Sequence, residues 1–179
     1  EGTIEVAKPM GVVGAVTPTT NPIVTPMCNA MFAVKGRNAI IVCPHPRAKA
    51  SSARTVRLMQ EAIAPLGAPE HLIQIIAEPT VELSGLVMKL CDVCISTGGM
   101  GMVRAAYASG KPAFGVGAGN VQCLIDEGVS YEEAVPMIIE GRRFDNGIIC
   151  SAEQTAIMPA GDYDQIVSLF VQHGAHYVS

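Results

Sequence analysis

The sequence predicts an α/β protein built on a doubly wound parallel sheet, and three observations support this prediction. Short runs rich in β-branched residues alternate with longer stretches that carry apolar residues at helical spacing. The composition is 49% hydrophobic and only 16% charged, as is typical of a sheet buried on both faces. Gly36, Gly67 and Gly110 stand where the ends of helices are expected. Such an alternation indicates repeated strand–helix–strand units, which form a parallel sheet.

Five strands and four helices are expected before residue 120. The strands are the buried apolar runs Val12–Val16, Asn38–Val42, Leu72–Ile76, Val93–Ser96 and Ala113–Val116. The helices are the stretches Pro26–Val34, Ala48–Ala64, Val81–Leu90 and Met100–Ser109. After Gly119 the pattern starts again, which predicts one domain over residues 1–120 and a second over residues 121–179.

The second domain is expected to be truncated. Its expected elements are Val121–Ile125, a helix near Tyr131–Glu140, a strand Thr155–Pro159, a helix Tyr163–His173 and the beginning of another strand at His176–Ser179. So few strands cannot close a core, so the 179 residues are expected to be a piece of a longer protein.

Composition argues against several classes of function. The formal net charge of −4 comes without any cluster of Lys and Arg, so nucleic acid is not an expected partner. No apolar run reaches the roughly 20 residues that cross a bilayer, so no membrane association is expected. The six cysteines lie mostly in apolar segments, which favours reduced thiols and a cytoplasmic location. Cys91 and Cys94 are expected on opposite faces of a strand, so no metal site is predicted.

The segment Thr97–Met102 is the first candidate for chemistry. It follows an expected strand and opens an expected helix, so its backbone N–H groups can cradle an anion. The spacing of Gly98, Gly99 and Gly101 is not that of the dinucleotide fingerprint, and a plain tight turn explains it equally well. Similarly, the run Gly115–Asn120 permits either close approach of a flat ligand or an interdomain hinge.

Two further loops follow expected strands. In Thr17–Pro22, the amide of Asn21 can point at a substrate or simply cap a helix. In Pro44–Lys49, Arg47 is positioned to meet a phosphate, although surface exposure alone also explains its charge.

Cys150 has a different setting from the other cysteines. It follows the turn Asp145–Gly147 and precedes the polar residues of Ser151–Glu153. A thiol at such a loop edge can be reached and ionised, as nucleophilic catalysis requires. From this local context alone, a buried and inert cysteine is an equally good interpretation.

Five motifs, in this order, resemble the CoA-acylating aldehyde dehydrogenases from about Gly11 to the end of the chain. They are Thr-Pro-Thr-Thr-Asn-Pro, Pro-His-Pro-Arg-Ala-Lys, Ser-Thr-Gly-Gly-Met-Gly-Met-Val, Gly-Val-Gly-Ala-Gly-Asn and Phe-Asp-Asn-Gly-Ile-Ile-Cys-Ser-Ala-Glu-Gln. The resemblance extends to the aldehyde dehydrogenase half of bifunctional aldehyde/alcohol dehydrogenases and to acylating sulfoacetaldehyde dehydrogenases. It implies a Rossmann-like cofactor domain followed by the start of an α/β catalytic domain.

The resemblance also implies roles for individual residues. Cys150 matches the nucleophile, and Asn21 matches the asparagine that stabilises the oxyanion. The positions expected near NAD or NADP are Gly14, Ala15, Val16, Thr17, Pro18, Thr19, His45, Arg47, Gly98, Gly99 and Gly117. CoA is the expected co-substrate, a small aldehyde the expected substrate, and the full-length protein is expected to form a homo-oligomer.

One difference from the hydrolytic aldehyde dehydrogenases bears on the acyl acceptor. In hydrolytic relatives, the strand that precedes the nucleophile in the sequence ends in a glutamate, and this glutamate activates water. This chain has Gly115-Val116-Gly117 in that region. The resemblance therefore favours thiolysis by CoA. The alternatives are a hydrolytic or acyl-phosphate-reducing relative and, in another class, an inactive nucleotide-binding or assembly fragment. Acetaldehyde and sulfoacetaldehyde, and likewise NAD and NADP, are left open.

Overall fold

The computed structural model describes residues 2–178 and divides the chain into two compact units. These are Glu1–Ala118 and Gly119–Ser179. The boundary between Ala118 and Gly119 lies close to residue 120, where the sequence pattern starts again. Within the described residues, no helix has both the length and the apolar character needed to cross a bilayer.

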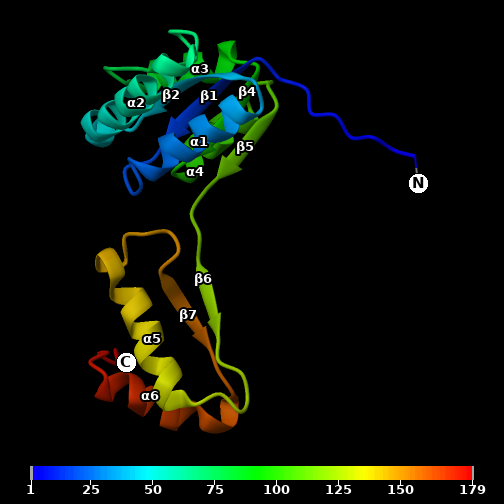
Figure 1. Cartoon of the computed structure of the whole chain (residues 1–179). Coiled ribbons are helices and arrows are strands. Elements are labelled where there is room, and N and C mark those ends of the chain that lie inside the picture. Colours follow the sequence, from blue (N-terminus) through cyan, green and yellow to red (C-terminus); the bar gives the residue numbers. More distant parts are fainter. Residues whose placement is uncertain (1, 179) are drawn as a thin grey trace. The chain divides into compact units, whose positions relative to one another are not determined.

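The first unit is a five-stranded, wholly parallel sheet, which confirms the predicted fold class (Figure 1). The strand order is β3-β2-β1-β4-β5. The strands are β1 (Val12–Thr17), β2 (Ala39–Pro44), β3 (Ile73–Ile75), β4 (Val93–Thr97) and β5 (Ala113–Val116). The helices are α1 (Val24–Lys35), α2 (Lys49–Ile63), α3 (Val81–Leu90) and α4 (Met100–Tyr107), with short 3-10 helices at Pro46–Ala48 and Ala64–Leu66.

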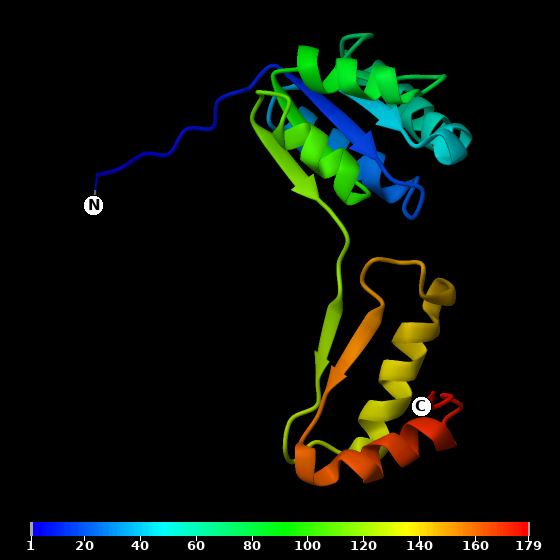
Figure 2. The ribbon, with the colours of Figure 1, turned by 180° about the vertical axis from the view of Figure 1, so that it is seen from behind.

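Helices cover both faces of this sheet (Figures 1 and 2). On one face, α1 and α2 pack over β1, β2 and β3 around a core that includes Ala15, Ile40 and Val56. On the other face, α3 and α4 pack around Cys43 and Met88. The two cores explain why β1, β2 and β4 are apolar at successive positions, because these central strands are buried on both sides.

Gly14 lies at the centre of the sheet, where β1 approaches α3. A Cβ atom at this position would lie 2.8 Å from Cγ1 of Val87 and 2.9 Å from Sγ of Cys91. We expect Gly14→Ala to lower the free energy of unfolding by about 1–3 kcal/mol, because the core must move to accept the methyl group. Urea unfolding monitored by circular dichroism measures this loss.

Gly85→Ala is the matched control for this substitution. Gly85 lies in α3, the helix that packs against Gly14, and a Cβ there would meet no atom within 4 Å. Alanine in an exposed helix interior should leave the unfolding free energy unchanged or raise it by about 0.5–1 kcal/mol. Equal effects of the two substitutions would contradict the close packing of Gly14.

The end of α1 differs in detail from the prediction. Gly36 is the capping residue, but its φ is −77°, and Arg37 adopts the left-handed conformation with φ 62°. The side chain of Asn38, expected inside the second strand, instead accepts hydrogen bonds from the N–H groups of Met10 and Gly11 at 2.6 and 3.0 Å. The strand therefore begins one residue later, at Ala39.

The second unit contains a two-stranded parallel sheet and two helices. Its elements are β6 (Val121–Leu124), α5 (Tyr131–Arg143), β7 (Glu153–Ile157) and α6 (Tyr163–Gln172), with 3-10 helices at Phe144–Gly147 and Ala160–Asp162. Ile125, Val135 and Ile166 form its buried centre. Figure 2 shows α5 beside the strands.

The strand expected at His176–Ser179 was wrong for residues 176–178, and Ser179 lies outside the described residues. Gly174 ends α6 in the left-handed conformation, with φ 97°. The N–H of Ala175 then bonds back to the carbonyl of Phe170 at 2.9 Å, which turns the chain against the helix. No strand of the described second unit pairs with residues 176–178.

The expectation that Cys91 and Cys94 lie on opposite faces of one strand was also wrong. Cys91 caps the end of α3, and β4 begins only at Val93, so the two side chains are not both in a strand. Their sulfur atoms lie 3.3 Å apart in the core. Burial, together with the hydrogen bond to Cys94, raises the pKa of Cys91 to about 11. Among residues 2–178, no group of three or more potential ligands is placed to hold a metal ion.

Candidate functional site

A pocket of about 270 Å³ lies in the first unit at the carboxyl ends of β1, β2 and β4. β1 is flanked by β2 on one side and by β4 on the other. The helix α1 after β1 packs on one face of the sheet and the helix α4 after β4 packs on the other, so the chain leaves β1 and β4 in opposite directions and opens a crevice between the loops. Ligands of doubly wound proteins bind in such a crevice.

The pocket brings together six of the residues singled out in the sequence. These are Val16, Thr17, Pro18, His45, Gly98 and Gly99. The other five lie elsewhere: Gly14 and Ala15 are in the core of the sheet, and Thr19, Arg47 and Gly117 are outside the lining. Gly14 and Ala15 lie inside β1, where helices pack on them, so they do not reach the crevice.

Backbone hydrogen bonds fix the shape of the crevice. The N–H of His45 donates to the carbonyl of Thr17 at 3.0 Å, and the N–H of Gly98 donates to the carbonyl of Val116 at 3.0 Å. Gly99 precedes the first turn of α4, and no side chain caps that turn. A Cβ at Gly98 or Gly99 would meet no atom within 4 Å, so the space above the turn is open. The first N–H groups of α4 are thus available to an anion.

Thr17 adds a second indication that the pocket takes a ligand. Its side chain is 2% exposed, and its Oγ1 has no hydrogen-bond partner among the described residues. A buried hydroxyl without a partner is costly, so a ligand or a water is expected to satisfy it. An orphan hydroxyl beside an uncapped helix start fits the diphosphate of a dinucleotide.

Residues of α3 that sequence reasoning missed also line the pocket. Thr80 and Val81 form the start of α3, and Ser84 follows one turn later. The Oγ1 of Thr80 accepts a hydrogen bond from the N–H of Leu83 at 3.0 Å. The sequence position of α3 could have predicted this, because α3 is the helix that follows β3. In a parallel sheet, the helices that follow the strands all begin at the same edge.

Cys150 lies in the second unit, in an exposed turn directly before β7. Three consecutive left-handed residues, Asp145, Asn146 and Gly147, precede it, with φ values of 50°, 51° and 68°. The N–H of Ile148 closes this turn on the carbonyl of Asp145 at 3.0 Å. Non-glycine residues in this conformation carry strain, which is concentrated at functional sites.

The segment Gly119–Asn120, which precedes β6, passes beside the turn that contains Cys150. Asn120 accepts a hydrogen bond from Oγ1 of Thr155 at 3.0 Å, and its carbonyl accepts one from the side chain of Gln122 at 3.1 Å. A Cβ at Gly119 would lie 3.8 Å from the carbonyl oxygen of Cys150. The segment that precedes β6 is therefore joined to β7 by a side-chain hydrogen bond, and it passes beside the backbone of Cys150.

The other thiols are poor candidates for chemistry. Cys43, Cys91 and Cys94 are buried, and Cys28 and Cys123 are half-buried, whereas Cys150 is exposed. Burial raises the pKa of Cys43, which disfavours its reactive thiolate. The alternative interpretation of Cys150 as a buried cysteine was wrong, because the turn carries it to the surface.

Asn21 lies in the loop between β1 and α1 and is half-buried. Its carbonyl accepts the N–H of Thr25, but the capping residue of α1 is Ile23. Among the described residues, the side-chain amide of Asn21 makes no hydrogen bond within the unit. The alternative role as a helix cap is therefore wrong, and the amide is available for another partner.

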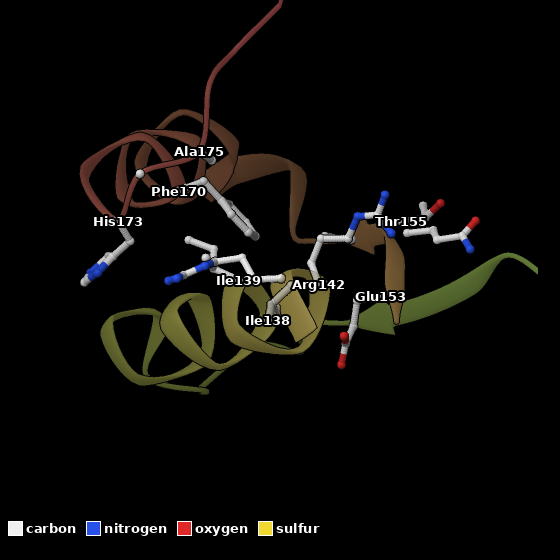
Figure 3. Close-up of a pocket in the computed structure, with 12 residues that line it drawn as sticks. Ile138, Ile139, Arg142, Glu153, Thr155, Phe170, His173 and Ala175 are labelled. Atoms are coloured by element: carbon white, nitrogen blue, oxygen red, sulfur yellow. The ribbon is translucent and has the colours of Figure 1, made fainter. Parts of the chain in front are cut away.

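A second cavity, of about 420 Å³, lies within the second unit between α5, α6 and β7 (Figure 3). Ile139 and Phe170 face the same space between the helices, with His173 at one end and Thr155 at the other. None of the residues singled out in the sequence lines it.

The combination of a crevice at the strand ends and an exposed turn cysteine agrees with the comparison with known families. The model of the aldehyde dehydrogenase family matches residues 1–177. The chain belongs to the aldehyde dehydrogenase family. The resemblance inferred from the five motifs is confirmed, including the likeness to acylating members.

Two relatives of this chain are named as dehydrogenases of particular aldehydes. The succinate-semialdehyde dehydrogenase (acetylating) of Clostridium kluyveri is 58% identical over 175 residues, 98% of this chain and 39% of that protein. The sulfoacetaldehyde dehydrogenase of an Acholeplasma species is 44% identical over 172 residues, 96% of this chain and 36% of that protein. The chain thus spans about two fifths of the length of these relatives.

Solved structures of family members match both units. An acetylating aldehyde dehydrogenase from Geobacillus thermoglucosidasius matches with a TM-score of 0.88 and 43% identity, over 97% of this chain and 39% of that one. A Rhodopseudomonas palustris propionaldehyde dehydrogenase with bound CoA and an acylated cysteine matches with a TM-score of 0.87 and 36% identity, over 96% of this chain and 40% of that one. An engineered glycolyl-CoA reductase with bound NADP⁺ matches with a TM-score of 0.87 and 37% identity, over 96% of this chain and 40% of that one.

Proposed function

We propose that this chain is the cofactor-binding and nucleophile-bearing part of a CoA-acylating aldehyde dehydrogenase. In this proposal, residues 1–120 bind NAD(P)⁺ and residues 121–179 begin the catalytic domain. The reaction converts a small aldehyde, NAD(P)⁺ and CoA into acyl-CoA and NAD(P)H. The observation that carries the proposal is the exposed thiol of Cys150, which follows the left-handed segment Asp145–Gly147 inside the matching motif.

Cys150 acts as the nucleophile. Its thiolate attacks the carbonyl carbon of the aldehyde, so that an S–C bond forms and the π electrons move to the carbonyl oxygen. The backbone N–H of Cys150 and the amide of Asn21 donate hydrogen bonds to this oxygen. The role of Asn21 rests on the motif match and on its unpartnered amide.

The residues of the first unit hold the oxidant. NAD(P)⁺, when bound, would supply the acceptor for the hydride that leaves the carbon attached to Cys150. The start of α4 at Gly99 and the Oγ1 of Thr17 are suited to bind its diphosphate. Met102 and Val16 line the crevice with apolar contacts that exclude water from this end of the sheet.

Loss of the hydride leaves an acyl group on Cys150 as a thioester. The thiolate of CoA then attacks the thioester carbonyl, the bond to Cys150 breaks, and the thiolate of Cys150 is restored. The segment Gly115-Val116-Gly117 offers no carboxylate that could activate water. This favours CoA over water as the acyl acceptor.

Short aldehydes are the proposed substrates. The names of two relatives suggest succinate semialdehyde and sulfoacetaldehyde as compounds to compare with acetaldehyde. Six thiols without a disulfide among the described residues support a reducing, cytoplasmic setting. We also propose that the full-length enzyme is a homo-oligomer.

Mass spectrometry of the intact protein tests this function. After exposure to aldehyde and NAD(P)⁺ without CoA, we expect one acyl group on the peptide that contains Cys150. Added CoA should remove this group and release stoichiometric acyl-CoA. Release of the free acid without CoA, or an adduct confined to another cysteine, would contradict the proposal.

A further inference from the structure

The turn after β2 carries positive charge beside the cofactor crevice. His45 lines the crevice, and Arg47 follows in the short 3-10 helix Pro46–Ala48. None of the residues that line the crevice in the described chain is acidic. In doubly wound proteins that use NAD, a carboxylate near this strand end commonly accepts the 2′-hydroxyl of the adenosine ribose, whereas a nearby arginine accommodates the 2′-phosphate of NADP.

Arg47 is the cation available at this turn. Lys49, two residues later, is paired with the carboxylate of Glu78, so its charge is already compensated. Within residues 2–178, Arg47 forms no ion pair, and its side chain is exposed. A guanidinium group in this position can bind a phosphate through two parallel N–H···O bonds.

His45 is oriented to assist Arg47. Its Nδ1 accepts the backbone N–H of Arg47 at 3.2 Å, which fixes the ring against the turn. In the neutral ring the proton then resides on Nε2, and this N–H can donate to a phosphate oxygen. The same hydrogen bond sets the conformation of the turn that carries Arg47.

We propose that this enzyme prefers NADP⁺ to NAD⁺, and that Arg47 and His45 bind the 2′-phosphate. The inference rests on the proposed function, because it assigns a ligand group within the same cofactor crevice. The preference has two sources: a pair of donors for the phosphate, and the absence of a carboxylate in the lining to accept a 2′-hydroxyl or repel the phosphate.

Equilibrium binding to the intact protein tests the preference without relying on turnover. Fluorescence titration should give a Kd for NADPH about 10- to 100-fold lower than for NADH. Arg47→Gln should weaken NADPH binding by about tenfold or more and change NADH binding by less than about twofold. Arg54→Gln is the matched control, because Arg54 is an exposed arginine of α2 outside the crevice. It should leave both Kd values unchanged.

Two nucleotide fragments identify the phosphate that Arg47 binds. Adenosine 2′,5′-bisphosphate should compete with NADPH better than AMP does, and Arg47→Gln should remove this advantage. A stronger preference for adenosine 3′,5′-bisphosphate, or equal Kd values for NADPH and NADH, would overturn the inference and leave the proposed function intact. Absence of binding by either dinucleotide to the folded protein would overturn both.

Discussion

Replacing Cys150 with serine should lower the kcat for CoA-dependent aldehyde oxidation by about four orders of magnitude or more. The thiolate is far more nucleophilic than a serine hydroxyl, which is essentially un-ionised near neutral pH. Removal of a covalent nucleophile costs about 10⁶-fold in a well-studied protease, so the expected loss is within the range for such residues. The measurement is the rate of NAD(P)H formation at saturating aldehyde and CoA.

The same substitution should leave dinucleotide binding nearly unchanged. Cys150 belongs to the second unit, whereas the cofactor crevice is built wholly from residues of the first. Cys123→Ser is the matched control, because Cys123 is half-buried in β6 of the same unit as Cys150. It should change kcat by less than about threefold. Parallel loss of binding and activity in Cys150→Ser would indicate a structural role for this cysteine.

The first sheet was predictable because its central strands, β1, β2 and β4, are buried on both faces. In β1, for example, Val13 and Ala15 belong to one core and Val16 to the other, so such a strand is visible as a short apolar run. The helices between them carry apolar residues on one stripe, which a helical period detects. The parallel fold therefore follows from local patterns alone.

Contacts distant in sequence were not predictable in this way. Asn38 was expected to begin a strand, but its side-chain oxygen accepts hydrogen bonds from the N–H groups of Met10 and Gly11, which are 28 and 27 residues away. The two thiols of Cys91 and Cys94 meet because Cys91 caps the end of α3 and the chain changes direction before β4, which contains Cys94. A prediction that extends one strand over both positions cannot include this change of direction.

The candidate site was partly predictable for a similar reason. Thr17 ends β1, His45 follows β2 and Gly99 lies two residues after β4, so the parallel topology places them at one edge. Thr80 and Ser84 carry no motif and enter the pocket only because α3 begins at that edge. Arrangement in space, which no single segment specifies, decides which of these residues share a cavity.

Asn21→Ala should lower kcat by about 10²- to 10³-fold. A side-chain donor that hydrogen-bonds the developing oxyanion stabilises the transition state more than the ground state, and its loss has this magnitude in other acyl-transfer enzymes. The amide of Asn21 has no partner among the described residues, so the substitution removes no hydrogen bond of the folded chain. The thermal midpoint of unfolding should therefore change by no more than about 2 °C.

The pattern of kinetic changes distinguishes this role from a structural one. Loss of a transition-state interaction lowers kcat and kcat/KM together, with little change in KM for the aldehyde. Gln74→Ala, at an exposed amide of β3, is the control and should have no measurable effect. Because Asn21 and Cys150 are proposed to serve one chemical step, the double variant Asn21→Ala/Cys150→Ser should be no slower than Cys150→Ser alone. Fully additive losses, or a raised KM with unchanged kcat, would show that Asn21 acts independently of the nucleophile.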